Sequence, residues 1–517
     1  MGLRHGLRQG LIVGLGVAMA AGAPVGQFAW GQTGTQPSRA QSASGKSGAA
    51  DTQPASFGTT RIHTLTDALA ASYANNPALQ AERARLRATD EGVPQALAGW
   101  RPQVSLAGTA GYGDGYSRQF LGGGATTLPN GSVVGVPGRQ SDSRTLRDIA
   151  TASATVTQPV YNGGKTKANI NKADNAVMAE RARLIVAEQT AMTETVTAYV
   201  NLIQAQQTLG LRVNNEQVLA RQLQATNDRF RVGEITRTDV AQAEAALAGA
   251  TADRERALGD LQIARSAFQK AVGFLPPPDL LEPQPLKLPI KNQTDAAQLA
   301  RNNNPSVVAA MFDNAAAKDN VDVQFSALMP SVSLQGQVFQ QANASSAHSN
   351  TNGYQVGAVL SVPLYQGGAE YSSVRQARQQ QQATQRTVDD AKRTAQQQAV
   401  QAWETLVSNR AQSESTRVQL RANQIALEGV QREAIVGSRT TLDVLNAQQL
   451  LLQSQLVLVQ NLAAVVNQSY IVAAAVGRLT ARDLSLPVSY YDETAYYNAV
   501  RNKWIGTGDQ AVDQPAR

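Results

Sequence analysis

The sequence contains no cysteine, which excludes disulfide bonds and a lipid-modified N-terminal cysteine. It has only three histidines, and one of them, His5, lies in an apolar N-terminal segment, which leaves His63 and His348. The chain therefore offers no cysteine nucleophile and no cluster of cysteine and histidine ligands. Its Gly-Gly pairs lack the spacing of a phosphate-binding loop. We expect a protein that is not an enzyme, with no catalytic residue, no metal site and no cofactor.

Aromatic side chains and concentrated charge are scarce as well. Phe, Trp and Tyr make up 5% of the chain, whereas Ala and Gln are plentiful. This composition favours long helices with thin packing over a thick globular core. The formal net charge of +7 is modest for 517 residues, and the Lys and Arg residues are scattered. The sequence therefore gives no indication of nucleic-acid binding.

The N-terminus has the pattern of a secretory signal. Arg4 and Arg8 precede an apolar stretch from Leu11 to Ala23. This stretch is shorter than the ~20 residues that a membrane-spanning helix requires. We therefore expect a cleavable signal peptide at 1–30 rather than a membrane anchor. A flexible leader at 31–62, rich in Ser, Gly, Gln and Thr, is expected to follow it.

The rest of the chain is a tandem duplication. Pro159-Val-Tyr-Asn-Gly-Gly164 matches Pro363-Leu-Tyr-Gln-Gly-Gly368, which lies 204 residues later. Upstream, Asn76-Pro77 matches Asn304-Pro305 at an offset of 228 residues. The difference of 24 residues is extra chain in the first copy, after Leu106, where a Gly- and Ser-rich loop is expected. Agreement at several points in register indicates two copies of one structural unit.

The duplication sets the expected domain boundaries. We expect a first structural repeat at 63–275 and a second at 292–480, joined by a Pro-rich linker at 276–291. A C-terminal tail follows at 481–517. Its aromatic residues are expected to pack against helices rather than to form a binding site: Tyr490, Tyr491, Tyr496, Tyr497 and Trp504.

Each copy contains two segments with the period of two that is typical of strands. In the first copy, Val104 and Leu106 alternate with polar or small residues such as Ser105. Strands are expected at about 103–113, 149–160, 331–341 and 353–364. Each has on the order of ten residues, which is the length of a tilted strand that crosses a bilayer. A soluble sandwich would show the same alternation, so this pattern alone does not distinguish the two.

Long helices dominate both copies. Nothing interrupts the helical pattern from Lys165 to Arg231 or from Ala369 to Ile435. About 67 residues of helix form a rod of roughly 100 Å. A shorter helix follows each rod, so helical hairpins are expected at 165–275 and 368–479. From Leu442 to Ala473 the second short helix keeps the heptad pattern of a coiled coil.

A further helix is expected at 64–98, with a break or cap at Asn76-Pro77. This helix and a shorter hairpin helix, stacked end to end, would about match the length of one long rod.

The tips of the two hairpins have the same pattern. The long helix ends at a Gly that tolerates positive φ, and the next helix begins with a Thr and an Asp that can bond its free N–H groups. The tip residues are Val232, Gly233, Thr236 and Asp239 in the first copy and Val436, Gly437, Thr440 and Asp443 in the second. Capping alone would explain both Asp residues without any functional role.

The number of strands sets a condition on the assembly. Four strands cannot enclose a lumen, and an open sheet edge is not tolerated in lipid. If the strands are transmembrane, several chains must share one barrel. Three chains would supply twelve strands, an even number within the bacterial range.

The motifs, in this order and repeated twice, resemble a known family. Asn-Asn-Pro, Pro-x-Val-Ser-Leu, Pro-x-Tyr-x-Gly-Gly and Val-Gly-x-x-Thr-x-x-Asp-Val make residues 62–480 similar to the TolC family of outer-membrane efflux and secretion channels. The resemblance implies a mainly α-helical protein with a transmembrane β-barrel. It implies a homotrimer, with four strands per chain in a shared twelve-stranded barrel and a long helical tunnel in the periplasm.

The resemblance also implies a function and partners. The channel would be a passive duct for multidrug efflux or type I protein secretion. Its partners would be outer-membrane lipid, a periplasmic membrane-fusion adaptor and an inner-membrane RND or ABC exporter. The alternative is a periplasmic coiled-coil scaffold without a barrel, which would explain the heptads but not the strand pairs.

Roles for the tip residues follow from the same resemblance. Asp239 and Arg439 match an Asp and an Arg whose link across neighbouring hairpins holds the family's periplasmic entrance shut, and Asp443 matches an acidic ring that narrows it. Two positions depart from the family pattern: Ala434 replaces a tip Tyr, and Asn446 replaces a second acidic residue of the entrance. We therefore expect a weaker restraint and one carboxylate per chain in the ring. The adaptor is expected to contact Val232, Gly233, Thr236, Val436, Gly437 and Thr440.

Overall fold

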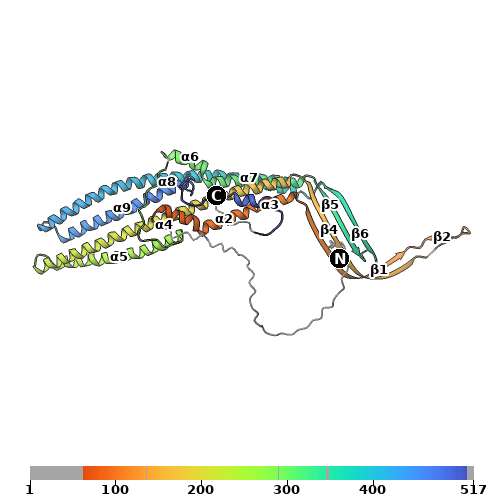
Figure 1. Cartoon of the computed structure of the whole chain (residues 1–517), viewed down its shortest axis with the longest axis horizontal. Coiled ribbons are helices and arrows are strands. Elements are labelled where there is room, and N and C mark those ends of the chain that lie inside the picture. The colour runs from red at the N-terminus through yellow and green to blue at the C-terminus, as the bar shows by residue number, and fades with distance from the viewer. Residues whose placement is uncertain (1–61, 136, 289, 345–347, 509–517) are drawn as a thin grey trace, which may run out of the picture. The chain divides into compact units, whose positions relative to one another are not determined.

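The computed structural model describes residues 62–508, apart from 136, 289 and 345–347 (Figure 1). The expected signal peptide and nearly all of the expected leader lie outside the described residues. The chain forms two compact units. One unit holds the sheet and comprises Ala98–Gly164 and Ser326–Gly367. The other holds the long helices and comprises Lys165–Phe325 with flanking segments on both sides.

The first unit is a four-stranded antiparallel sheet to which each sequence copy contributes one hairpin. Its strands are β1 (Gln103–Leu121), β4 (Arg139–Asn162), β5 (Ser331–Ala342) and β6 (Asn350–Ser361), in that order across the sheet. Within the described residues, β1 and β6 each pair along one edge only. The sheet therefore has two free edges in the single chain.

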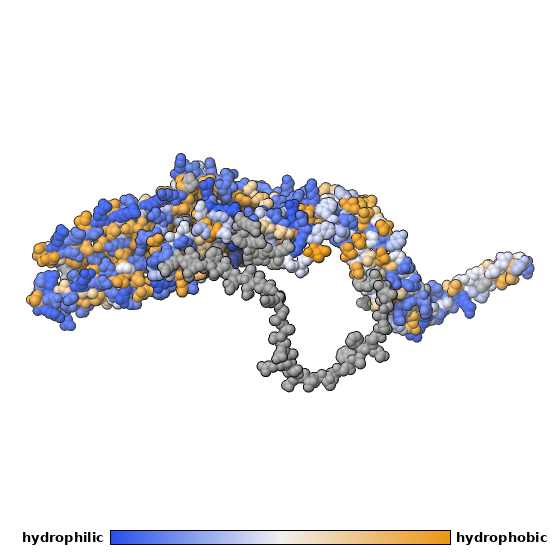
Figure 2. Space-filling model, viewed as in Figure 1, coloured by the Kyte–Doolittle hydropathy of each residue, from blue (hydrophilic) through white to orange (hydrophobic). Residues whose placement is uncertain are grey.

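The register of the sheet gives it two different faces. Residues that pair across strands share a face, and successive rows alternate between faces. One row is Val104, Val156, Gly336 and Val356, and the next is Ser105, Thr155, Gln337 and Gln355. Apolar side chains of the first face are exposed in the single chain, with exposed fractions of 79% for Val356 and 83% for Tyr354. Figure 2 shows apolar patches over the strands. This face therefore needs an apolar surrounding that the chain does not provide.

The first hairpin is longer than the sequence indicates. β1 and β4 extend to Leu121 and back from Arg139, whereas the alternation predicts strands only at about 103–113 and 149–160. The segment between them, expected to be a loop, contains a small hairpin of β2 (Ala125–Thr127) and β3 (Val133–Gly135). β5 and β6 have only 12 residues each. The extra chain in the first copy therefore lengthens its hairpin.

Ion pairs hold this extension together. Arg144 lies 2.7 Å from Asp114, and Arg118 lies 3.0 Å from Asp142. Each pair joins opposite strands, and Tyr116 also donates to Asp142 at 2.7 Å. Opposite charges on directly facing strands favour the pairing of those strands. They do not produce the apolar alternation from which strands are predicted.

The second hairpin has nearly the expected length. β5 covers the predicted 331–341, and β6 begins and ends three residues before the predicted 353–364. It ends at Ser361, shortly before Pro363, which has no N–H group for a strand ladder.

The second unit contains two long helical hairpins (Figure 1). The first pairs α4 (Lys165–Arg231) with α5 (Arg237–Val272), and the second pairs α8 (Ala369–Ile435) with α9 (Thr441–Ala475). α4 and α9 lie side by side, so α5 and α8 are the outer helices of the two hairpins. Of the helices in the described residues, α9 alone is long and apolar enough by composition to cross a membrane. In the structure it packs along α8, as its heptad pattern predicts.

Shorter helices complete this unit. They are α1 (Leu65–Asn75), α2 (Pro77–Asp90), α3 (Gly92–Leu97), α6 (Gln293–Asn303), α7 (Pro305–Phe325) and α10 (Ala495–Val500). The sheet unit adds two 3-10 turns, η1 (Ala98–Trp100) and η2 (Ser326–Leu328). The helix expected at 64–98 breaks at Asn76, as predicted, and also at Glu91. The second break follows from Pro94, which cannot donate to the carbonyl four residues earlier.

One of these helices, α7, joins α9 end to end, whereas the sequence predicts an end-to-end stack only for the helix at 64–98. Where α9 meets α7, the side-chain amide of Asn304 donates to the Ala475 carbonyl at 3.0 Å, and its oxygen accepts from the Ser306 N–H at 2.9 Å. One side chain thus satisfies the free end of one helix and the free start of the next. Gly477, with φ of 79°, turns the chain away beside this junction. A Cβ there would collide with the Asn303 carbonyl.

The aromatic tail packs against the helices, as expected for a structural role. The guanidinium carbon of Arg83 in α2 lies 4.7 Å from the Tyr73 ring centroid and 5.1 Å from that of Tyr491. The Tyr491 N–H donates to the Tyr73 hydroxyl at 3.1 Å. Tyr497 donates to a carboxylate of α4 at 2.9 Å. Trp504 departs from this expectation, since 66% of it is exposed.

A buried carboxyl group lies at the end of α2. Asp90 is 1% exposed, and neither of its oxygens has a hydrogen-bond partner. Burial raises the pKa of Asp90 to about 7, opposed by the charge of Arg181 and reinforced by Glu91 and Glu493. The group is therefore mostly protonated in mildly acidic solution.

We expect the stability of the helical unit to fall as the pH rises from about 4 to about 7 and then to level off. The unfolded chain ionises Asp90 near pH 3.9, whereas the folded chain keeps the proton up to about pH 7. Asp90→Asn should remove this slope, which is worth at most about 4 kcal/mol. Thermal unfolding followed by circular dichroism across this pH range measures it, with Asp260→Asn, at an exposed position of α5, as the control. Equal slopes for Asp90→Asn and the wild type would contradict the expectation.

Candidate functional site: the helical hairpin tips

Each tip turns on a glycine in the left-handed region. Gly233 has φ of 80° and Gly437 has φ of 81°. In the first tip, the Glu234 N–H donates to the Arg229 carbonyl at 3.0 Å. In the second, the Ser438 N–H donates to the Glu433 carbonyl at 3.0 Å. Each bond satisfies one carbonyl in the last turn of its helix, and each glycine supplies the positive φ of the turn, as the sequence predicts.

Both short helices begin with the same capping box. Asp239 accepts from the Thr236 N–H at 3.0 Å and from its hydroxyl at 2.7 Å, and the Asp239 N–H donates back to Thr236 at 3.4 Å. Asp443 and Thr440 make the same three bonds at 3.0, 2.8 and 3.2 Å. Within one chain, both Asp residues therefore cap a helix start.

The capping bonds keep both carboxylates ionised. The pKa of Asp239 is lowered by the Thr236 hydroxyl first and by the Thr236 N–H next. The pKa of Asp443 is lowered by the Thr440 N–H and then by its hydroxyl. A capping role and a fixed negative charge at the tip are thus compatible.

The tips also expose apolar side chains. Val232 and Val436 occupy equivalent positions, and each is 78% exposed. Ile435 beside the second glycine is 82% exposed, whereas Ala434 is buried. Asn446 lies exposed on the first turns of α9. Exposed apolar residues at the end of a hairpin are typical of a contact surface.

Arg439 is engaged within its own hairpin. Its Nε lies 2.8 Å from Oε2 of Glu433, and this carboxylate is the main cause of the raised pKa of Arg439. The first tip has a corresponding pair, in which Arg229 lies 2.6 Å from Glu234. The two members of the expected link, Arg439 and Asp239, therefore each have partners in their own hairpins. Sequence reasoning missed both ion pairs, although opposite charges flank each tip glycine within a few residues.

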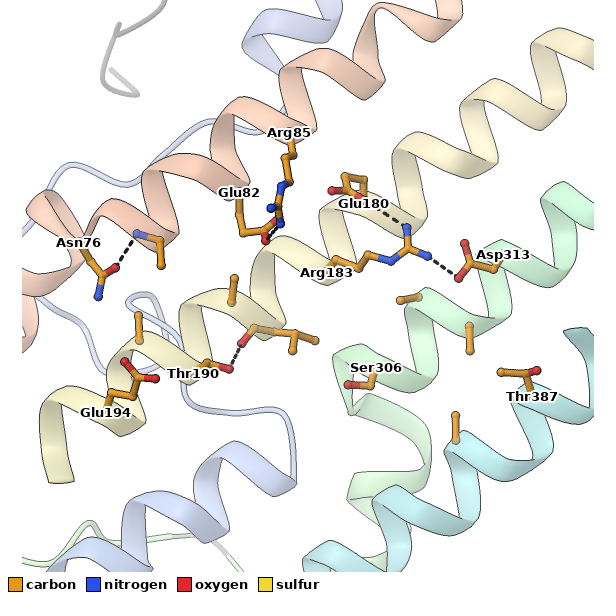
Figure 3. A pocket seen from close by; sticks show the side chains of 17 residues that line it. Asn76, Glu82, Arg85, Glu180, Arg183, Thr190, Glu194, Ser306, Asp313 and Thr387 are labelled. Carbon is orange, nitrogen blue, oxygen red and sulfur yellow. Dashed lines mark hydrogen bonds and ion pairs between the residues drawn. The ribbon is translucent and has the colours of Figure 1, made fainter. Parts of the chain in front are cut away.

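A cavity of about 640 Å³ lies farther along the helical unit, between α2, α4, α7 and α8. Figure 3 shows Arg183 between Glu180 and Asp313, to which it bonds at 3.0 and 2.6 Å. Glu82 and Glu194 also line the cavity. Because four helices contribute its walls, no local motif reveals it. Among the described residues, no group of three or more His, Cys, Asp or Glu side chains could hold a metal ion.

These features define a class of protein. A two-faced sheet with both edges free needs other copies of the chain, and long helical hairpins of rod-like length suit the wall of a tunnel. The chain has the organisation of one subunit of an oligomeric membrane channel.

Comparison with known proteins gives the family. The model of the family described as outer membrane efflux protein matches residues 68–274 and 296–478, that is, both repeats. The outer membrane efflux protein BepC of Brucella suis is 33% identical over 446 residues, which cover 86% of this chain and 91% of that protein. Outer membrane protein TolC of Escherichia coli is 24% identical, covering 86% of this chain and 89% of TolC.

The fold agrees with solved channels. The crystal structure of the Campylobacter jejuni CmeC outer membrane channel matches with a TM-score of 0.66 and 14% identity, over 85% of this chain and 89% of that one. The chain belongs to the outer membrane efflux protein family, to which TolC belongs. It is an outer-membrane efflux channel and not an enzyme. Membership implies a trimeric channel that works with pump systems, and it excludes the scaffold without a barrel.

We expect Thr440→Val to loosen the second tip. The substitution keeps the shape of the side chain and removes the hydroxyl that accepts from the Asp443 N–H, at a cost of about 1 kcal/mol. Faster amide hydrogen exchange at residues 441–444 is the expected result. Thr238→Val, at an exposed position that caps nothing, is the matched control. Unchanged exchange in Thr440→Val would contradict the capping account.

Proposed function

We propose that three copies of this chain form a passive duct across the outer membrane. A shared twelve-stranded barrel would continue into a tunnel of long helices in the periplasm. The duct would receive substrates from an inner-membrane RND or ABC exporter through a periplasmic membrane-fusion adaptor. The observation that carries this proposal is the pair of free edges, on β1 and β6, of a sheet with one apolar and one polar face.

The free edges support closure between chains. In hydrocarbon, each unpaired backbone N–H or C=O group costs several kcal/mol, because no water can bond it. Pairing β6 of one copy with β1 of the next removes both edges. The apolar face that carries Val356 and Tyr354 would then contact lipid, and the row with Ser105 and Gln337 would line the lumen.

The long helices support the tunnel. α4 and α8 each have 67 residues, which corresponds to roughly 100 Å of helix. The end-to-end junction of α9 and α7 extends one of the two shorter hairpin helices. A protein bound for the outer membrane must first cross the inner membrane, which is the role we propose for a signal peptide at 1–30.

The tips would form the entrance. Three Asp443 carboxylates, each ionised and capped, would form an acidic ring that narrows it, and Asn446 leaves this ring with one carboxylate per chain. Between neighbouring hairpins, Asp239 and Arg439 would restrain the closed state. The adaptor would contact the exposed tip residues, with Val232 and Val436 as its apolar anchors.

Cysteine pairs across the proposed seam should cross-link the chain into trimers. The chain has no native cysteine, so only engineered pairs can form disulfides. Val104→Cys on β1 would be combined with Cys at Tyr354, Val356, Ala358 or Leu360 on β6, all on the same face. Two strands separate β1 from β6 within a chain, a gap of roughly 14 Å, which a disulfide cannot span.

Non-reducing gels should show a ladder that ends at the trimer for at least one pair. Ser105→Cys with the same four partners is the matched control, because its side chain lies on the opposite face and should not cross-link. A ladder that ends at another number of chains would contradict the trimer, and no cross-link from any pair would contradict the shared barrel.

Removing the acidic ring should change how the channel responds to cations. Three carboxylates close together attract multivalent cations, so such cations should block the wild-type channel in planar bilayers. Asp443→Ala should lose this block, whereas Asn446→Ala, which changes no charge, should keep it. Unchanged block in Asp443→Ala would remove Asp443 from the entrance.

A further inference from the structure

The ends of the two long helices carry opposite charges at equivalent positions. Arg229 in the last turn of α4 and Glu433 in the last turn of α8 are 204 residues apart, which is the offset of the repeat. Each pairs across its glycine turn with a loop residue, Arg229 with Glu234 and Glu433 with Arg439. The order of the charges is therefore reversed between the tips.

The second ion pair controls the availability of Arg439. Arg439 and Glu433 are 50% and 51% exposed at their side chains, so water and other carboxylates can reach both. An exposed pair of this kind is weak, because screening and side-chain entropy offset most of the attraction. Arg439 can thus exchange Glu433 for another carboxylate at little cost.

The order of the helices indicates which carboxylate that is. α5 and α8 are the outer helices of the two hairpins, so in a ring of copies α8 of one chain meets α5 of the next. Glu433 and Arg439 lie at the tip end of α8. Asp239 lies in the first turn of α5, where Thr236 donates twice to Oδ2 and leaves Oδ1 available.

We propose that Glu433 is a positioning residue that competes with the neighbouring copy's Asp239 for the guanidinium of Arg439. While Glu433 holds Arg439, the seam between copies lacks its ion pair and the entrance opens more readily. When Glu433 releases Arg439, the seam closes. The inference rests on the proposed function, since it requires a ring of copies with the tips at its entrance.

The expected size of the effect follows from the strength of exposed ion pairs. Removing the competitor should shift the open-to-closed ratio by about 1.5- to 5-fold per hairpin. If the three hairpins move together, the shift is roughly 3- to 100-fold. It should disappear in high salt, because the Debye length falls from about 10 Å at 0.1 M to about 3 Å at 1 M.

The test is the resting conductance of the full-length protein in planar bilayers at low salt. Glu433→Gln should lower the open fraction, and this effect should vanish when Asp239→Asn is also present. Glu428→Gln breaks an exposed ion pair of α8, with Arg432, without touching Arg439 or Asp239 and should leave the open fraction unchanged. The double variant Glu433→Arg with Arg439→Glu keeps an ion pair within the second tip. Because position 439 then carries a negative charge, it cannot pair with Asp239 of the neighbouring copy. This variant should therefore not lower the open fraction.

The outcomes separate the inference from the function on which it rests. An unchanged or raised open fraction in Glu433→Gln, with an active wild-type channel, would overturn the competition. A drop that persists with Asp239→Asn, or in high salt, would also overturn it, because Arg439 would then act through another group. A wild-type protein without channel activity would overturn the proposed function itself.

Discussion

Backbone groups at a sheet edge have no partner in lipid unless another strand supplies it, and this constraint governs the whole molecule. In the part of the chain that the structure describes, the main sheet has four strands with an apolar face and a polar face, and the outer edges of β1 and β6 are unpaired. The unpaired edges are not stable in a membrane for one chain alone, whereas the exposed apolar face is stable only in contact with lipid or another apolar surface. Membership of a family of outer-membrane efflux channels agrees with this requirement.

The helical unit has a different constraint: it must form long walls from helices of unequal length. Asn304 joins α9 to α7 by bonding Ala475 on one side and Ser306 on the other. The hydroxyl of Tyr199, a fully buried residue, lies 3.1 Å from the carbonyl oxygen of His63 and 2.7 Å from that of Leu281, so its single O–H can bond either connecting segment to α4. These buried polar contacts act beside an apolar cluster, which includes Leu69, Met192 and Phe268 and packs the faces of the helices together.

Much of this architecture is predictable from sequence because it repeats. The duplication locates both hairpins, the glycines at their tips and the Asn-Pro junctions, and the capping Thr and Asp residues follow from local chemistry. The extension of β1 and β4 was missed because ion pairs such as Arg144 with Asp114 stabilise it without apolar alternation. The burial of Asp90 could not be predicted from the sequence either, because it depends on packing between segments that are distant in the chain. At the tips, the family resemblance points to Asp239 and Arg439, but only the three-dimensional structure shows that Glu433 pairs with Arg439.

The central claim is that one chain cannot complete the sheet and that several copies are required. The most direct measurement is the mass of the folded protein, extracted from outer membranes in mild detergent, by light scattering with the detergent contribution subtracted. The account predicts three times the mass of one mature chain, with loss of sheet signal when the assembly is dissociated. A folded monomer that keeps its sheet and stays soluble without detergent would contradict it.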